Sequence, residues 1–243
     1  MNSHTRYVSD PRDNQLLAAL TDAEWSRWRL DLEPMNLTTG MVLCESGSSP
    51  AYAYFPTTAI ISLLNMTEDG ASSEIAVVGN DGVVGIPLFM GGGTMPCQAV
   101  VQSPGEGYRL RAQIVKSEVE RATPMLYVLL RYTQAMIAQV AQTAACNRYH
   151  SIDQQLCRRL LLGLDRLPSY ELAFTQELLA RLLGVRRESV TAAALKLQQA
   201  GLIRYSRGHI DVLDRRRLEQ RTCECYAMSK KEYNRLVPMP VAA

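Results

Sequence analysis

The chain has few of the residues and patterns on which enzyme active sites depend. It contains three histidines among 243 residues, and it shows no nucleophile–base pair, metal-ligand cluster, Walker loop or dinucleotide fingerprint. The sequence therefore argues against an enzyme. It also lacks an apolar run of the roughly 18 residues that a membrane-spanning helix needs, and its N-terminal segment is polar. We expect a protein that is neither exported nor inserted into a membrane, and a cytoplasmic location.

Cysteine is present, but not in the pattern of a disulfide scaffold or a metal centre. Six cysteines are spread along the chain, a usage that suits a reducing compartment. The only close pair is Cys223 and Cys225, and two ligands separated by one residue do not make a site. A lone histidine such as His150 is more often a hydrogen-bonded structural residue than a haem ligand. We therefore expect no metal and no cofactor, and we interpret the cysteine pair as structural.

The two parts of the chain differ in charge. Residues 1–150 hold 10 Lys and Arg against 14 Asp and Glu, a net charge of −4. Residues 151–243 hold 16 against 10, a net charge of +6. This difference indicates a polyanionic partner for the C-terminal part alone, and nucleic acid is the leading candidate.

Short β-rich runs separated by turn residues fill the N-terminal part. They follow a short amphipathic helical pattern that includes Leu16 and Trp28. The six runs are MVLCE, AYAYF, TAIISLLNM, SEIAVVG, CQAVVQ and GYRLRA. Turn signals separate them at intervals of roughly 8 to 12 residues, which predicts an antiparallel β-barrel or sandwich.

A long helix is predicted to follow the strands. Thr123 suits the N-cap and Pro124 the first helical position, and no Gly or Pro interrupts residues 125–145. A stripe with near-heptad spacing on this helix contains Leu126, Leu129, Thr133, Met136 and Val140. The stripe either packs on the β domain of the same chain or forms a seam with a second copy. We predict a homodimer seam, because the β domain is too small to cover both faces of the helix.

A second helix and a compact unit complete the chain. Ser151 and Gln154 have capping-box spacing, and the helix that they start should end near Leu167. Residues 175–212 then have the pattern of a helix, a tight turn at Gly184, a second helix and a β-hairpin. This arrangement is typical of a winged helix-turn-helix.

The start of the second helix in this unit carries the chemistry of base recognition. Arg donates two hydrogen bonds to guanine, Glu accepts a hydrogen bond from cytosine, and hydroxyl groups bond to bases or phosphates. The residues predicted to contact DNA are Thr175, Gln176, Arg186, Arg187, Glu188, Ser189, Thr191, Lys196, Arg204, Arg207 and His209. Each one alone is most simply a solvated polar residue. Together with the apolar two-helix frame and the Gly turn, they predict DNA binding.

Residues 174–212 resemble the winged helix-turn-helix of the Crp/Fnr family of bacterial transcription regulators. A Thr-capped helix, a Gly turn and the sequence Arg-Glu-Ser-Val at residues 187–190 carry the resemblance. The resemblance implies an α+β fold: an N-terminal antiparallel β-roll of the cyclic-nucleotide-binding type over residues 13–122, a dimerisation helix and hinge over residues 123–150, and a C-terminal winged helix-turn-helix domain over residues 151–243.

The same resemblance implies the partners. We expect a homodimer that binds double-stranded DNA at an inverted-repeat operator, with half-site centres roughly 10 base pairs apart. RNA polymerase is a further partner that the resemblance allows. Ala192 stands where some members carry another Arg, so the half-site that those members read is not expected.

A candidate effector pocket lies in the β-roll, but a cyclic nucleotide is not expected in it. Relatives that bind cyclic nucleotides carry a Glu and, some ten residues later, an Arg; here Ile86 and Cys97 stand near those positions. Burying a phosphate without a cation is costly, and a Gly-rich loop is a partial substitute. The residues proposed to line the pocket are Gly91, Gly92, Gly93, Thr94, Cys97 and Arg109. No cysteine precedes Cys44, so the N-terminal iron–sulfur cluster of other members is not expected.

The competing hypothesis belongs to a different class of function. It is a cyclic-nucleotide- or other small-ligand-binding module whose winged domain makes protein contacts. The excess of positive charge after residue 150 and the basic start of the second helix favour the DNA-binding regulator, because a protein-binding winged domain needs neither.

Overall fold

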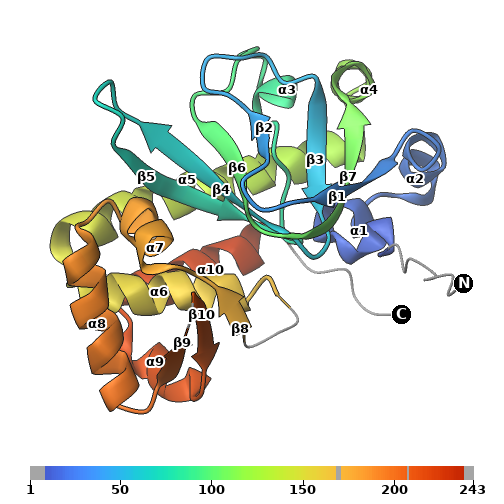
Figure 1. Ribbon diagram of the computed structural model, residues 1–243. Coiled ribbons are helices and arrows are strands. Elements are labelled where there is room, and N and C mark those ends of the chain that lie inside the picture. Colours follow the sequence, from blue (N-terminus) through green and yellow to red (C-terminus); the bar gives the residue numbers. More distant parts are fainter. Residues whose placement is uncertain (1–8, 168–170, 207, 238–243) are drawn as a thin grey trace, which may run out of the picture.

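The computed structural model describes residues 9–167, 171–206 and 208–237. An N-terminal β-roll lies above a C-terminal unit of helices and a small sheet (Figure 1). The helices are η1 (Pro11–Asp13), α1 (Gln15–Ala18), α2 (Asp22–Trp28), α3 (Pro87–Met90), α4 (Ala112–Glu120), α5 (Pro124–Tyr149), α6 (Ile152–Leu164), α7 (Gln176–Leu183), α8 (Arg187–Gln199), α9 (Arg215–Arg221) and α10 (Glu224–Leu236). Within the described ranges, no helix is both long enough and apolar enough to cross a membrane.

Within the described residues, the strands form three antiparallel sheets. Their bounds are β1 (Glu33–Leu37), β2 (Val42–Cys44), β3 (Tyr52–Pro56), β4 (Ile60–Met66), β5 (Ser72–Val78), β6 (Gln98–Ser103), β7 (Gly105–Arg111), β8 (Glu171–Ala173), β9 (Ile203–Ser206) and β10 (His209–Val212). Strand orders β1-β7-β3 and β2-β6-β4-β5 make the β-roll. All six predicted strands are confirmed. Sequence reasoning missed β1, whose Pro34 is tolerated because β1 lies at a sheet edge.

The core of the β-roll is continuous with one face of α5. Leu129 and Met136 of α5 are buried in the same apolar cluster as the inward side chains of the two sheets. Leu236 and Val237, at the end of α10, also belong to this cluster. Segments from three parts of the sequence therefore build one core. The predicted domain boundaries at residues 122 and 150 stay a prediction.

The two predicted central helices are confirmed, with shifted ends. Pro124 occupies the first turn of α5, which continues to Tyr149, beyond the predicted residue 145. The Ser151 capping box is present, since the Ser151 side chain accepts from the backbone N–H of Gln154 and Gln154 Oε1 accepts from the Ser151 backbone N–H at 3.1 Å. Helix α6 ends at Leu164 rather than near residue 167.

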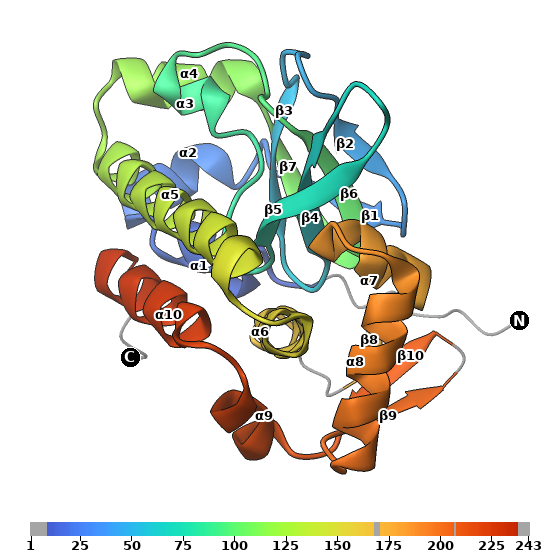
Figure 2. The ribbon, with the colours of Figure 1, turned by 90° about the vertical axis from the view of Figure 1, so that its left-hand side faces the viewer.

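The last helix returns from the C-terminal unit to the β-roll. Helix α10 lies beside α5 (Figure 2). The Tyr233 hydroxyl lies 3.1 Å from Gln15 Oε1 and donates a hydrogen bond to the carbonyl of Asp81. Both ends of the C-terminal unit, α6 and α10, are thus attached to the long helix.

The C-terminal unit has a core of its own and touches the β-roll. Sheet β8-β10-β9 packs with α6, α7 and α8 around a second apolar cluster. Helix α7 contacts β5 of the β-roll. Gly184 approaches Ser73 so closely there that a Cβ atom added to this glycine would lie 3.3 Å from the Ser73 Cβ. The winged helix-turn-helix arrangement predicted for this unit is therefore present.

Candidate nucleic-acid interface

Helices α7 and α8 form a rigid two-helix frame. The Thr175 side chain caps α7 by accepting from the backbone N–H of Leu178 at 3.1 Å. Gly184 has φ +65°, a left-handed conformation that Gly adopts at little cost, and it ends α7 with the reversal that a helix-turn-helix needs. Leu179 and Val190, one from each helix, are fully buried. The frame fixes the direction in which the start of α8 points.

The start of α8 is polar and exposed. Arg186, Arg187 and Glu188 are exposed, and Ser189 is half-buried. Within the part of the chain that the structure describes, no hydrogen bond or ion pair engages the side chains of Arg186, Arg187 and Glu188. These groups are free to reach a ligand, and the adjoining helix N-terminus favours an anion.

A side-chain contact joins the two helices next to this surface. The Thr191 hydroxyl lies 2.9 Å from Gln176 Oε1 and 3.0 Å from the carbonyl oxygen of Arg187. This contact holds the first residue of α7 against the exposed face of α8. Thr175, Gln176 and Thr191 therefore lie together beside the start of α8.

The remaining predicted DNA contacts flank this surface. Lys196 lies 3.5 Å from the half-buried Asp153 and Arg204 lies 3.9 Å from Asp211, whose side chain is 43% exposed, and both cations are themselves exposed. Exposed ion pairs contribute about 0–1 kcal/mol, so either cation can exchange its partner for a phosphate at little cost. His209 is exposed at the start of β10, and Arg207 lies outside the described residues.

An apolar groove of about 380 Å³ opens between the β-roll and α5. Its lining residues are Leu63, Ile75, Val83, Val84, Gly85, Ile86, Pro87, Met90, Gly92, Thr94, Met95, Pro96, Cys97, Thr133, Met136 and Val140. This lining includes Gly92, Thr94 and Cys97 from the predicted pocket but no charged side chain. Burial raises the pKa of the Cys97 thiol to about 11, so it stays neutral at physiological pH.

The other predicted pocket residues lie elsewhere. Gly91 and Gly93 are exposed on the loop after α3. Arg109 is on the sheet β1-β7-β3, where its guanidinium lies 2.8 Å from Glu33 and stacks over the Tyr52 ring at 4.3 Å. The hydrogen bond from Arg109 lowers the pKa of Glu33. Arg109 is thus engaged with its own sheet and does not line the groove.

The predicted dimer stripe lies mainly against the β-roll: its members Leu126 and Val140 are half-buried, and Val140 packs on the core of the β-roll. Leu129, Thr133 and Met136 are buried against the β-roll of the same chain, with exposed fractions of 3%, 6% and 6%. The large apolar residues of α5 that face away are Tyr127, Leu130, Ile137 and Tyr149, at 67%, 40%, 63% and 80% exposed. The most apolar part of the stripe therefore belongs to the chain's own core, which was the alternative interpretation of the pattern.

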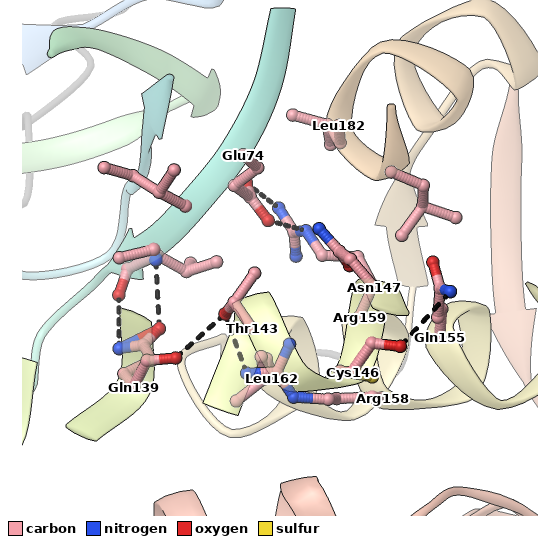
Figure 3. A pocket seen from close by; sticks show the side chains of 14 residues that line it. Glu74, Gln139, Thr143, Cys146, Asn147, Gln155, Arg158, Arg159, Leu162 and Leu182 are labelled. Carbon is pink, nitrogen blue, oxygen red and sulfur yellow. Dashed lines mark hydrogen bonds and ion pairs between the residues drawn. The ribbon is translucent and has the colours of Figure 1, made fainter. Parts of the chain in front are cut away.

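A buried ion pair joins α6 to the β-roll. Figure 3 shows Arg159 of α6 pointing at Glu74 of β5, with Arg159 Nε 2.6 Å from Glu74 Oε1. Nearby, the Arg158 guanidinium donates to the Thr143 hydroxyl at 3.0 Å. These side chains surround a cavity of about 20 Å³, which holds no more than a water molecule. The junction is a closed contact between the two parts of the chain.

Sequence reasoning missed one group of possible metal ligands. Ligand atoms of Cys146, His150, Cys223 and Cys225 all lie within 4.8 Å of one another. Within the sequence only two local signals existed: Cys146 and His150 are four residues apart at the end of a helix, and Cys223 and Cys225 are two apart. The fold brings these two pairs together.

Comparison with known proteins supports the fold and the C-terminal domain. A family model described as the Crp-like helix-turn-helix domain matches residues 154–221. Curated protein sequences include no significant match. The chain is similar to a solved structure from Eubacterium rectale described as a regulator of the crp/fnr family, with 18% identity over 86% of this chain and 98% of that chain and a TM-score of 0.65.

Two further solved structures have the same fold. FixK2 from Bradyrhizobium japonicum shows 14% identity over 79% of this chain and 98% of that chain, with a TM-score of 0.66. A transcriptional regulator of the CRP family from Thermus thermophilus, TTHB099, shows 16% identity over 77% and 95% of the two chains, with a TM-score of 0.62.

These similarities confirm the α+β fold class and the resemblance predicted from the sequence. They are similarities to a family of transcription regulators, not of enzymes. The chain therefore has the fold of the Crp/Fnr transcription regulators, and its residues 154–221 form a Crp-like helix-turn-helix domain.

Proposed function

We propose that the protein is a homodimeric, sequence-specific DNA-binding transcription regulator. The observation that carries the proposal is the start of α8, where Arg186, Arg187 and Glu188 are exposed on a buried two-helix frame and, among the described residues, have no side-chain hydrogen bond or ion pair. A helix presented in this way enters the major groove with its N-terminal residues at the base edges.

The contacts divide into base readers and backbone contacts. Arg187 and Glu188 read bases, because a guanidinium forks onto guanine and a carboxylate accepts from cytosine. The others contact bases or phosphates: Thr175, Gln176, Arg186, Ser189, Thr191, Lys196, Arg204, Arg207 and His209. Exposed cations beside a basic hairpin suit phosphate contacts, which position a protein without reading sequence.

The homodimer would form along the exposed face of α5. Tyr127, Leu130, Ile137, Ala141 and Ala144 follow one another at intervals of three, four or seven residues, and the five are exposed. An apolar stripe of this spacing is typical of a helix that pairs with a second helix. Small alanines at one end would let the two helices approach closely. Two recognition helices related by this axis would bind an inverted repeat.

The regulator is not gated by a cyclic nucleotide in this proposal. The groove beside α5 has an apolar lining with no cation to neutralise a phosphate, and a buried phosphate without a cation is costly. An effector that fits it is neutral and largely apolar. The groove also favours the second candidate function, a ligand-binding module whose winged domain contacts proteins. A measurement of DNA binding distinguishes the two candidate functions.

Titration of the protein against a selected operator and a scrambled duplex tests the proposal. Arg187→Ala should cost about 1–3 kcal/mol on the operator, roughly 5- to 150-fold in Kd, and flatten the preference at one base pair. Arg204→Ala should weaken both duplexes alike and lower the salt slope by about one.

The control is Arg29→Ala, which removes an exposed cation at the end of α2 and should leave both affinities unchanged. Equal losses on the two duplexes for Arg187→Ala would refute its role as a base reader. A wild-type protein without operator preference would favour the second candidate function. Contact with RNA polymerase, part of the same proposal, is tested by transcription from an operator-bearing promoter with purified polymerase.

A further inference from the structure

Three buried thiols and one imidazole meet where α5 ends and α10 begins. The Sγ atoms of Cys146 and Cys223 lie 3.5 Å apart, and Cys225 Sγ lies 3.5 Å from His150 Nδ1. The four ligand atoms all lie within 4.8 Å of one another. Cys146, Cys223 and Cys225 are 1%, 4% and 2% exposed. The four side chains therefore converge on one point between two helices.

Local structure holds each pair of ligands in place. His150 is the C-cap of α5, and its backbone N–H bonds to the carbonyl of Cys146 at 3.1 Å, so both side chains project from the last turn. Cys223 is the N-cap of α10, and Cys225 lies in its first turn. Gln155 Nε2 donates to the carbonyl of His150 at 2.9 Å, which fixes the α5–α6 junction.

Apolar packing does not account for this burial. The three cysteines form a cluster of their own, separate from the two large cores, with no aliphatic or aromatic member. Buried cysteines in a core normally pack as small hydrophobes among other apolar side chains. Here the thiols face one another and a ring nitrogen.

The spacing matches a tetrahedral zinc site. Zinc–sulfur bonds of about 2.3 Å and zinc–nitrogen bonds of about 2.0–2.1 Å give tetrahedral edges of about 3.8 Å between sulfurs and about 3.6 Å between sulfur and nitrogen. The observed separations, 3.5 Å up to a limit of 4.8 Å, bracket those edges. A disulfide would need a sulfur–sulfur distance of about 2.05 Å, and it would leave the third thiol and the imidazole unused.

The surroundings suit a bound cation. His150 Nε2 lies 3.3 Å from a carboxylate oxygen of Glu224, so Nε2–H faces the carboxylate and Nδ1 presents its lone pair to the thiols, the arrangement usual for zinc-bound histidine. Three thiolates and Zn²⁺ carry a net charge of −1. Arg158, 6% exposed, acts electrostatically on Cys146 and Cys225 and can balance that charge.

We propose that Cys146, His150, Cys223 and Cys225 bind one Zn²⁺ ion per chain in a closed, structural site. Four protein ligands leave no open position for catalysis, and three sulfurs with one nitrogen in a tetrahedron select zinc. Cys146 and His150 precede residues 154–221, which match the family domain, and Cys223 and Cys225 follow them. The ion links the C-terminal end of α5 to the N-terminal end of α10.

Metal content of the full-length protein, purified without chelator from zinc-supplemented cells, tests the site. We expect about one zinc per chain, and a level below about a tenth for Cys146→Ser, Cys223→Ser and Cys225→Ser, because the binding energy requires all the ligands. The matched controls are Cys97→Ser and Cys157→Ser, buried thiols outside the cluster, which should keep one zinc.

Replacing zinc by cobalt tests the site in the wild-type protein itself, so the test does not depend on variants that fold poorly. The wild-type protein should show the intense visible absorption of tetrahedral cobalt bound to thiolates, and His150→Cys should retain binding with a changed spectrum. Glu224→Ala should weaken zinc binding by about 10- to 100-fold. A folded wild-type protein that takes up no zinc, or control and ligand variants with equal zinc content, would overturn the proposal. So would a metal-free protein with a disulfide among these three cysteines.

Discussion

Replacing Glu74 by Gln removes the charge that neutralises a deeply buried guanidinium. The Glu74 and Arg159 side chains are 6% and 4% exposed, and they join β5 of the β-roll to α6. In the variant Arg159 keeps its bond to Gln102 Oε1, at 3.0 Å, and its position over the Phe174 ring. Neither contact supplies a negative charge, so an uncompensated cation stays in the interior.

Breaking a buried pair by removing one partner costs about 3–5 kcal/mol. We expect the lower end, about 3 kcal/mol, because Gln102 still solvates the guanidinium. An internal control exists in the exposed pair of Arg109 and Glu33, whose side chains are 37% and 36% exposed. Glu33→Gln should cost about 0–1 kcal/mol. The contrast isolates the effect of burial, since both pairs join the same residue types.

Urea unfolding followed by tryptophan fluorescence and by circular dichroism measures both losses. Trp25 and Trp28 report the β-roll, and coincidence of the two signals tests whether the parts unfold together. The double variant Glu74→Leu/Arg159→Met should have a stability near that of wild type or above it, because it removes both charges of this pair and leaves neither unpaired. If Glu74→Gln loses no more stability than Glu33→Gln, the ion pair does not hold the two parts together.

Three further outcomes are expected. Ile137→Glu should convert the dimer to a monomer in sedimentation at micromolar concentration, whereas Arg131→Glu, also exposed on α5, should not; a dimeric Ile137→Glu variant would exclude this seam. Cyclic AMP and cyclic GMP should give no heat of binding in calorimetry. A saturable isotherm in the low micromolar range would contradict the inference that an apolar groove without a cation does not bind a cyclic nucleotide. Burial opposes ionisation of Asp165, but its hydrogen bond from Arg215 and the charge of Lys230 hold its pKa below the usual range. The stability that this group contributes is complete above about pH 4, the unfolded value, and is lost as pH falls through the folded pKa. The difference in unfolding free energy between wild type and Asp165→Asn should therefore shrink below about pH 4, and a difference that stays constant at lower pH would refute this assignment.

Local signals predicted most of the elements. The capping box at Ser151, Pro124 at the start of α5 and the left-handed Gly184 each specify a helix end by chemistry within a few residues. The β-rich runs between turn residues specified six strands in the same way. Strand β1 was missed because Pro34 and Asn36 carry no strand signal, and its position is set by pairing with β7.

The faces of α5 show what a pattern cannot specify. Near-heptad spacing identifies a stripe but not the surface that covers it. The β-roll takes the bulkiest part, Leu129 and Met136, while α10 packs on another face and Ile137 is left exposed. The partner helix α10 comes from the far end of the chain.

The cysteine cluster was missed for the same reason. Cys146 and Cys223 are 77 residues apart, and each local pair alone carries too few ligands to indicate a site. Only the return of α10 along α5 brings the pairs together. The residues proposed to read bases at the start of α8, by contrast, lie in one continuous segment of the sequence.

The attachment of the winged unit at both its ends constrains how it can move. A domain joined by one flexible link can swing and twist about several axes. Here the unit leaves α5 through α6 and comes back to it through α10, whose Tyr233 and Leu236 are anchored on the β-roll. With both ends attached, the easiest remaining motion is a rotation about the line through the two attachments, which would separate α7 from β5. Any other reorientation of α8 requires that α10 first separate from α5.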